Sequence, residues 1–158
     1  MKTATLKTLE QTDNVSLYSI CFDGKAVSEY ETFVQKFKED AKFITEYKTI
    51  ILAIEKIVAV GAFERFFRPE GKMSDRVAAL AIDSRKLRLY CLRISDQILI
   101  LGNGGEKTTK TYEESEELSG YVMDLQAFDK LLLEAQKDGS ITIEKNVITG
   151  IEGKVFQL

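Results

Sequence analysis

The chain has 158 residues, of which 44% are hydrophobic and 30% are charged, and its formal net charge is −3. This balance is typical of one ordinary globular domain and argues against disorder. Because the chain has no histidine and only two cysteines, a zinc site or a serine–histidine triad is not expected, and neither is any cofactor. The sequence begins without a basic and then apolar leader, and no apolar run approaches the roughly 18 residues of a membrane span, so we expect a cytoplasmic protein that does not bind membranes.

The first part of the chain predicts a β-hairpin followed by a helix. Residues 3–9 and 15–22 alternate apolar and polar side chains, which is typical of two half-buried strands. Ser28 and Glu31 have the spacing of a capping box, so a helix is expected to begin there and to run to about Asp40.

The next segment predicts a second helix and then two short strands. Apolar side chains recur at helical spacing from Ile44 to Val58, and Gly61 is the expected end of that helix. Residues 62–68 place aromatic side chains among arginines, which is typical either of a plain strand or of a surface that binds nucleic acid. Residues 73–83 alternate enough for a strand, although a short helical turn would also fit.

Residues 87–94 and 98–101 predict a hairpin at the centre of the sheet, with its turn at residues 95–97. Alternation puts Arg88 on the same face as Tyr90 and Leu92, where a charged side chain needs a reason. The second strand is apolar on both faces, as a covered central strand would be. Cys21 and Cys91 lie in such apolar patterns and are expected to be buried, reduced thiols.

The rest of the chain predicts a glycine-rich turn, a helix and two strands. The glycines at residues 102–105 predict a sharp chain reversal, and the alternative is a loop whose backbone amides bind a phosphate. Residues 118–137 form an amphipathic pattern that ends at Asp138 and Gly139, and residues 141–143 and 154–158 are expected to pair as short strands.

Basic residues gather in the middle third of the chain. Residues 1–64 carry a net charge of −2, residues 65–110 carry +5 and residues 111–158 carry −6. An anionic partner for the middle third is therefore plausible, while the alternative is that these lysines and arginines only solvate strand edges.

The order of strand, helix, helix and antiparallel sheet resembles the RelE/ParE superfamily of small toxins, especially its HigB-like branch. The similarity covers about residues 15–112 and lies in Arg88-Leu89-Tyr90, the apolar strand 98–101 and the stretch Lys107-Thr108-Thr109-Lys110-Thr111. The resemblance implies an α+β fold with two helices packed on a mostly antiparallel sheet. Residues 113–158 would be an additional C-terminal helix and short hairpin within the same single domain.

The same resemblance implies the toxin of a type II toxin–antitoxin system, a metal-independent endoribonuclease that cleaves messenger RNA. The 2′-hydroxyl of the substrate is then the nucleophile, so basic side chains suffice to hold the phosphate and stabilise the transition state. The catalytic residues implied are Arg68, Arg88, Lys107 and Lys110, and the RNA-binding residues implied are Arg65, Arg93, Tyr90 and Tyr112.

The partners implied are an antitoxin of helix-turn-helix type and RNA or the ribosome, and a homodimer is possible. Two alternatives remain open from the sequence. The chain could be a catalytically inactive RelE-like module that binds a protein segment, or it could bind a small anionic ligand at residues 102–107.

Overall fold

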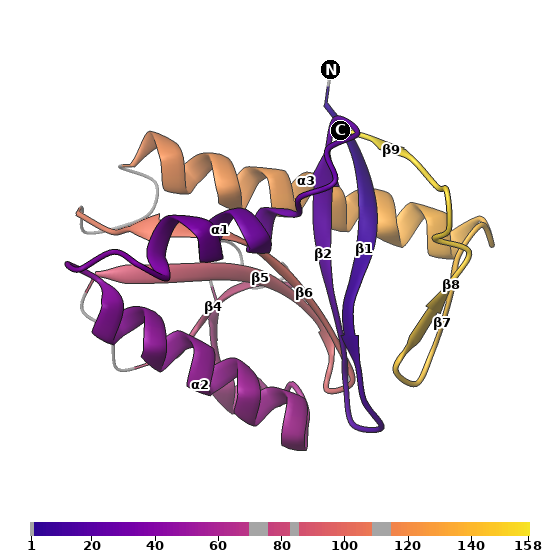
Figure 1. Cartoon of the computed structure of the whole chain (residues 1–158). Helices are drawn as coiled ribbons and strands as arrows, with labels where there is room; N and C mark the ends of the chain where they lie inside the picture. Colours follow the sequence, from indigo (N-terminus) through magenta and orange to yellow (C-terminus); the bar gives the residue numbers. More distant parts are fainter. Residues whose placement is uncertain (1, 70–75, 83–85, 109–114) are drawn as a thin grey trace.

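The structure is a computed structural model that describes residues 2–69, 76–82, 86–108 and 115–158. A seven-stranded sheet lies between helices on both of its faces (Figure 1). The strands lie in the order β3-β4-β5-β6-β2-β1-β9, and all neighbours are antiparallel except β2 and β6. Their bounds are β1 Thr3–Gln11, β2 Ser16–Phe22, β3 Phe67–Pro69, β4 Val77–Leu80, β5 Leu87–Ser95, β6 Ile98–Glu106 and β9 Phe156–Gln157.

Three helices cover this sheet. They are α1 (Glu29–Phe37), α2 (Ile44–Val60) and α3 (Glu116–Lys137), and a short 3₁₀ turn, η1 (Glu64–Phe66), precedes β3. The predicted α+β class and the mostly antiparallel sheet are therefore confirmed. Within the described ranges, no helix is both long enough and apolar enough to cross a membrane.

Side-chain alternation along β5 builds two separate cores. Leu87, Leu89 and Cys91 face α1 and α2, whereas Tyr90 and Leu92 face α3, as the sequence pattern predicts. The predicted buried and unpaired state of both cysteines is also confirmed. The sheet is thus covered on both faces, which explains why β6 is apolar on both sides.

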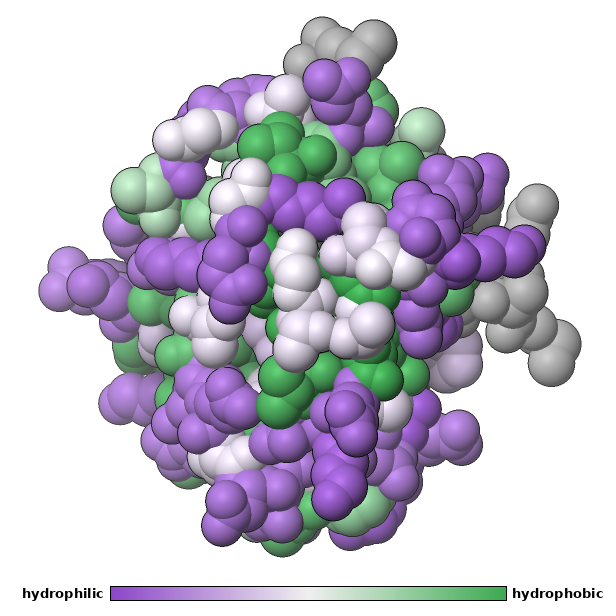
Figure 2. All heavy atoms as spheres, turned by 90° about the vertical axis from the view of Figure 1, so that its right-hand side faces the viewer, coloured by the Kyte–Doolittle hydropathy of each residue, from purple (hydrophilic) through white to green (hydrophobic). Residues whose placement is uncertain are grey.

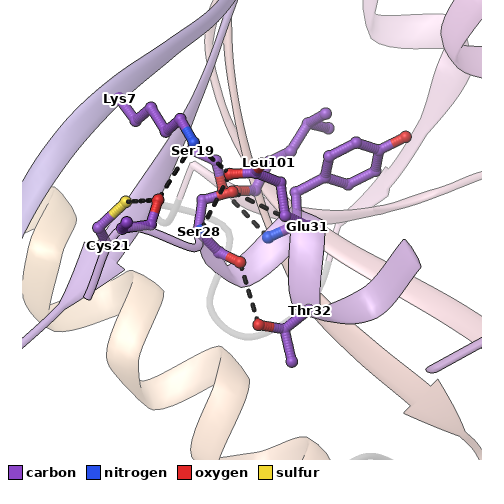
Figure 3. A network of polar contacts seen from close by, with 9 residues as sticks. Lys7, Ser19, Cys21, Ser28, Glu31, Thr32 and Leu101 are labelled. Carbon is purple, nitrogen blue, oxygen red and sulfur yellow. Dashed lines mark hydrogen bonds and ion pairs between the residues drawn. The ribbon is translucent and has the colours of Figure 1, made fainter. Parts of the chain in front are cut away.

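The predicted capping box begins α1. The Ser28 hydroxyl accepts a hydrogen bond from the Glu31 N–H at 3.2 Å, and the Glu31 carboxylate accepts one from the Ser28 N–H at 3.0 Å. The same carboxylate pairs with Lys7 of β1 at 2.7 Å, so the start of α1 is fastened to the sheet (Figure 3). Ser19 of β2 completes this attachment, because its hydroxyl accepts from the Tyr30 N–H and donates to the Leu101 carbonyl.

The glycine-rich segment is a strand and not a turn. Residues 102–105 are buried within β6, and they pair with β5 around an irregularity between Leu89 and Cys91. An extra residue there is accommodated because Gly104 has no side chain: a Cβ atom on it would lie 1.9 Å from the Arg88 carbonyl oxygen. The expectation of a chain reversal was therefore wrong, and these amides do not form a phosphate-binding loop.

The C-terminal segment also differs from the prediction. Residues 142–144 (β7, Thr142–Glu144) pair with β8 (Val147–Thr149) in a separate hairpin, while β9 pairs with the start of β1. Helix α3 covers the sheet face opposite α1 and α2, and its Val122, Leu125 and Phe128 are fully or almost fully buried there. This helix is therefore a layer of the fold, placed where the resemblance did not anticipate it.

Candidate functional site

Three of the eight residues implied by the resemblance lie at one corner of the sheet, formed by η1, β3 and the ends of β4 and β5, but Arg68 is on the α3 face of the sheet and Arg93 is on the α2 face. Arg65 and Arg68 are exposed there, and the Arg65 guanidinium lies 5.0 Å from the Phe63 ring centre and 4.7 Å from that of Phe66. Arg93 reaches the same corner from β5, and it lines a cavity together with Phe67. We call this region the η1–β3 corner.

The arginine of β5 is held in a fixed direction. The Arg93 Nε donates to the Ala62 carbonyl at 2.8 Å, and its two Nη atoms pair with Glu64 and Asp96. Its side chain is only 19% exposed, whereas that of Glu64 is 88% exposed. One carboxylate partner therefore lies in solvent and can move aside when an anion approaches.

Arg76, which directly precedes β4, links that strand to α3. Arg76 donates from Nε to Asp129 at 2.9 Å and from Nη2 to the same oxygen at 2.5 Å. The Asp129 side chain is 11% exposed, so this is a largely buried ion pair. The cavity at the corner has a volume of about 620 Å³, and it is lined by Glu64, Phe67, Pro69, Arg76, Val77, Ala78 and Arg93.

The other implied residues do not join this corner. Arg88 and Lys107 lie at the opposite end of the central hairpin, because Arg88 pairs with Gly105 and the Lys107 N–H donates to the Lys86 carbonyl. Arg88 is five residues from Arg93 along β5, which corresponds to about 17 Å. Arg88 and Arg93 also lie on opposite faces of β5, so one phosphate is not expected to contact both. Arg68 is level with Tyr90 through Ala79 and therefore shares the face of Arg88 and not that of Arg93.

Tyr90 was expected to contact RNA, but its side chain is fully buried in the core beneath α3. It therefore has no surface on which a base could stack, and that expectation was wrong for this structure. The cause is α3, since Tyr90 would be exposed on a sheet without a helix on this face. Lys110 and Tyr112 lie outside the described residues.

A second polar cluster lies where the sheet divides, and sequence reasoning missed it. Beyond Ser19 and Leu101, β2 and β6 are no longer paired, and α1 lies beside the separated part of β6 (Figure 1). The Lys36 ammonium of α1 donates to the Gly104 carbonyl at 2.8 Å and to the Tyr121 hydroxyl of α3 at 3.1 Å.

The ionisable groups of this cluster are partly dehydrated. Burial lowers the pKa of Lys36 and raises the pKa values of Glu29 and Tyr121. The Tyr121 hydroxyl also donates to Glu117 at 2.9 Å. The two hydrogen bonds of Lys36 join α1 to β6 and to α3. No sequence signal marks this cluster, since its members lie on three elements.

No group of three or more histidine, cysteine or acidic side chains that could hold a metal ion occurs among the described residues. Comparison with models of protein families, with curated proteins and with solved structures finds no match to the chain.

Proposed function

We propose that the chain is a RelE/ParE-like toxin that acts on RNA and contacts it at the η1–β3 corner. The observation that carries this proposal is the corner itself, where exposed Arg65 lies against the Phe63 and Phe66 rings, exposed Arg68 follows in β3, and a cavity is lined by Arg76 and Arg93. Single-stranded RNA is bound by this combination, because guanidinium groups pair with phosphates and aromatic faces stack on bases.

The chain order adds support to the proposal. A strand, two helices and then an antiparallel set of strands follow one another as β2, α1, α2 and β3–β6. This is the order on which the resemblance to the toxin superfamily rests.

The chemistry we propose is attack of the substrate 2′-hydroxyl on the adjacent phosphorus: the 2′-oxygen–phosphorus bond forms as the bond to the 5′-oxygen breaks. The 2′-hydroxyl gives its proton to water and the departing 5′-oxygen takes one from water, which leaves a 2′,3′-cyclic phosphate and a 5′-hydroxyl. The phosphorane formed on the way carries more negative charge than the ground-state phosphate, so arginine donors stabilise it more strongly. Arg65 and Arg68 would contact the phosphate from the exposed side. Arg93, held by Ala62 and Asp96, would orient the chain of the RNA once the Glu64 carboxylate moves aside.

The test is bacterial growth after tightly controlled expression of the wild type and of an Arg65→Ala/Arg68→Ala variant. We expect the wild type to arrest growth and the variant to permit it at equal soluble level. The matched control is Lys48→Ala/Lys137→Ala, which removes the same charge from exposed helical positions and should still arrest growth.

RNA from the arrested cells should carry new 5′ ends that are absent with the corner variant. Arrest by the wild type and the corner variant alike would refute the role of the corner. Normal growth with the wild type would refute the toxin proposal as a whole.

A second candidate function is the catalytically inactive binding module. The observation that favours it is α3, which covers the sheet face that carries Arg88 and Tyr90. For such a module, the purified chain would bind single-stranded RNA or a protein partner and would leave RNA intact. Incubation of the purified chain with labelled messenger RNA, both free and on translating ribosomes, therefore separates the two functions.

A further inference from the structure

The outer edge of β1 is open along most of its length. The short strand β9 pairs only with Thr3 and Ala4, at the start of β1 (Figure 1). Within the ranges that the structure describes, no strand pairs with residues 5–11 on that side. An edge of this kind presents backbone donors and acceptors to solvent.

The direction of these backbone groups follows from two hydrogen bonds at the start of β1. The Thr3 carbonyl accepts from the Asp23 N–H beside β2 at 2.9 Å, whereas the Lys2 carbonyl accepts from the Leu158 N–H beside β9 at 2.9 Å. Because these directions alternate along a strand, the N–H and C=O groups of Leu6 and Thr8 point away from β2. The register is regular up to Thr8, where an irregularity begins.

A groove lies beside this stretch of edge. It has a volume of about 410 Å³, and residues 5–8 form one wall while Ile151, Glu152 and Gly153 form the other. Figure 2 faces this side of the molecule, and the middle of the view shows weakly polar and apolar atoms framed by strongly hydrophilic ones. β9 pairs with the same edge of β1 immediately before the groove. A strand bound in the groove would therefore extend the pairing that β9 begins.

The two faces of the groove differ in chemistry. Lys7 lies on the α1 side, where its ammonium donates to the Ala26 carbonyl at 3.1 Å and to Glu31, and exposed Lys25 lines the groove as well. Leu6 lies on the α3 side and belongs, with Ile151, to the core there. A strand added to this edge would therefore meet exposed Lys25 and the Lys7–Glu31 ion pair on one face, and the largely buried Leu6 and Ile151 on the other, with Glu152 at the opposite wall.

We propose that this groove binds an extended peptide segment of a partner protein, which adds to β1 as a further strand. The peptide would place an acidic side chain at exposed Lys25 and small apolar side chains over Leu6 and Ile151, while its backbone pairs with Leu6 and Thr8. A second copy of the chain is a poorer occupant, because antiparallel pairing of two β1 edges about Lys7 would bring two like charges together.

The test begins with a displayed library of random 12-residue peptides selected on the purified full chain. We expect enrichment of peptides that combine an acidic residue with small apolar residues. Binding of a selected peptide should slow the hydrogen exchange of the Leu6 and Thr8 amides, which meet no strand in the free chain. Absence of enrichment, or binding that leaves both amides unchanged, would overturn the proposal.

The decisive variant is Thr8→Pro, which removes one outward N–H from an edge position where proline is tolerated. We expect it to weaken peptide binding about tenfold or more, while the control Thr8→Ala, which keeps that N–H, binds as the wild type does. Equal binding by Thr8→Pro would contradict strand addition.

The variant Lys25→Glu changes only an exposed side chain, so it can test the groove even if Thr8→Pro does not fold. It should weaken the binding of acidic peptides, and binding that is unchanged would refute the charge preference. A dimer seen by light scattering and lost in Thr8→Pro would replace the peptide with a second copy. None of these measurements depends on the effect of the chain on growth, so they remain decisive if the toxin proposal fails.

Discussion

The substitution Gly104→Ala tests the position of the glycine-rich segment within the sheet. A Cβ atom on Gly104 would lie 1.9 Å from the Arg88 carbonyl oxygen and 2.9 Å from the Leu89 Cα. Both atoms belong to the backbone of the paired strand, so the collision cannot be relieved by turning a side chain. The two strands must move apart, and at least one hydrogen bond of the ladder is then weakened.

The expected loss of stability can be worked from these contacts. Overpacking of a rigid site costs about 1 to 3 kcal/mol, and a weakened hydrogen bond adds about 1 kcal/mol. Alanine recovers about 0.5 to 1 kcal/mol relative to glycine in the interior of a strand. The net loss is therefore about 1 to 3.5 kcal/mol, which for a chain of this size lowers the melting temperature by roughly 2 to 14 °C.

The assay is urea unfolding followed by far-UV circular dichroism, since the chain has no tryptophan. The matched control is Gly105→Ala, whose Cβ would lie 3.2 Å from the Glu117 carboxylate, the end of a side chain that is 61% exposed and can turn away. We expect the control to change the unfolding free energy by less than about 1 kcal/mol. Equal effects of the two substitutions would refute the strand geometry and would restore the glycine-rich turn.

Two further predictions concern burial of polar groups. Burial raises the pKa of Tyr30 to about 12, from 10.0. As the pH rises, the unfolded chain therefore loses the Tyr30 proton before the folded chain does. The folded state is stabilised by about 2 to 3 kcal/mol below pH 10, and this stabilisation is lost as the pH rises towards 12. Tyr30→Phe should flatten the fall in urea midpoint between pH 10 and 12, and an unchanged fall would exclude Tyr30 as its cause. Arg76→Ala leaves the Asp129 carboxylate unpaired and should cost about 2 to 4 kcal/mol, whereas Arg76→Met/Asp129→Leu should cost less than that single change. If the same urea unfolding finds the double variant less stable than Arg76→Ala, an unpaired Asp129 carboxylate is not what makes Arg76→Ala unstable.

The parts of the fold that could be predicted from the sequence are those that neighbouring residues determine. Ser28 and Glu31 lie three residues apart and specify the start of α1 by their own hydrogen bonds. The strict alternation from Leu87 to Leu92 likewise reports which face of β5 each side chain joins. Such signals need no knowledge of the remainder of the chain.

The parts that could not be predicted depend on distant neighbours. Residues 102–105 favour a turn by composition, yet the Arg88 carbonyl approaches Gly104 so closely that no side chain fits there, and the Leu125 side chain packs tightly against Gly102. The exclusion of Tyr90 from the surface depends on α3, which lies far along the chain. The Lys36 cluster is assembled in the same way, from α1, β6 and α3.

The single parallel junction of the sheet, between β2 and β6, has a consequence for the order of folding. Ser19 and Leu101 meet there across a sequence separation of 82 residues. Closing a loop of that length costs roughly 4 kcal/mol of chain entropy before any contact across the junction is gained. Each flanking hairpin closes over only a few residues, so we expect the β1–β2 and β5–β6 hairpins to form early and the junction to set the folding rate. Ser19→Ala should then slow refolding more than it speeds unfolding. The two halves of the sheet would each form before they pair through β2 and β6.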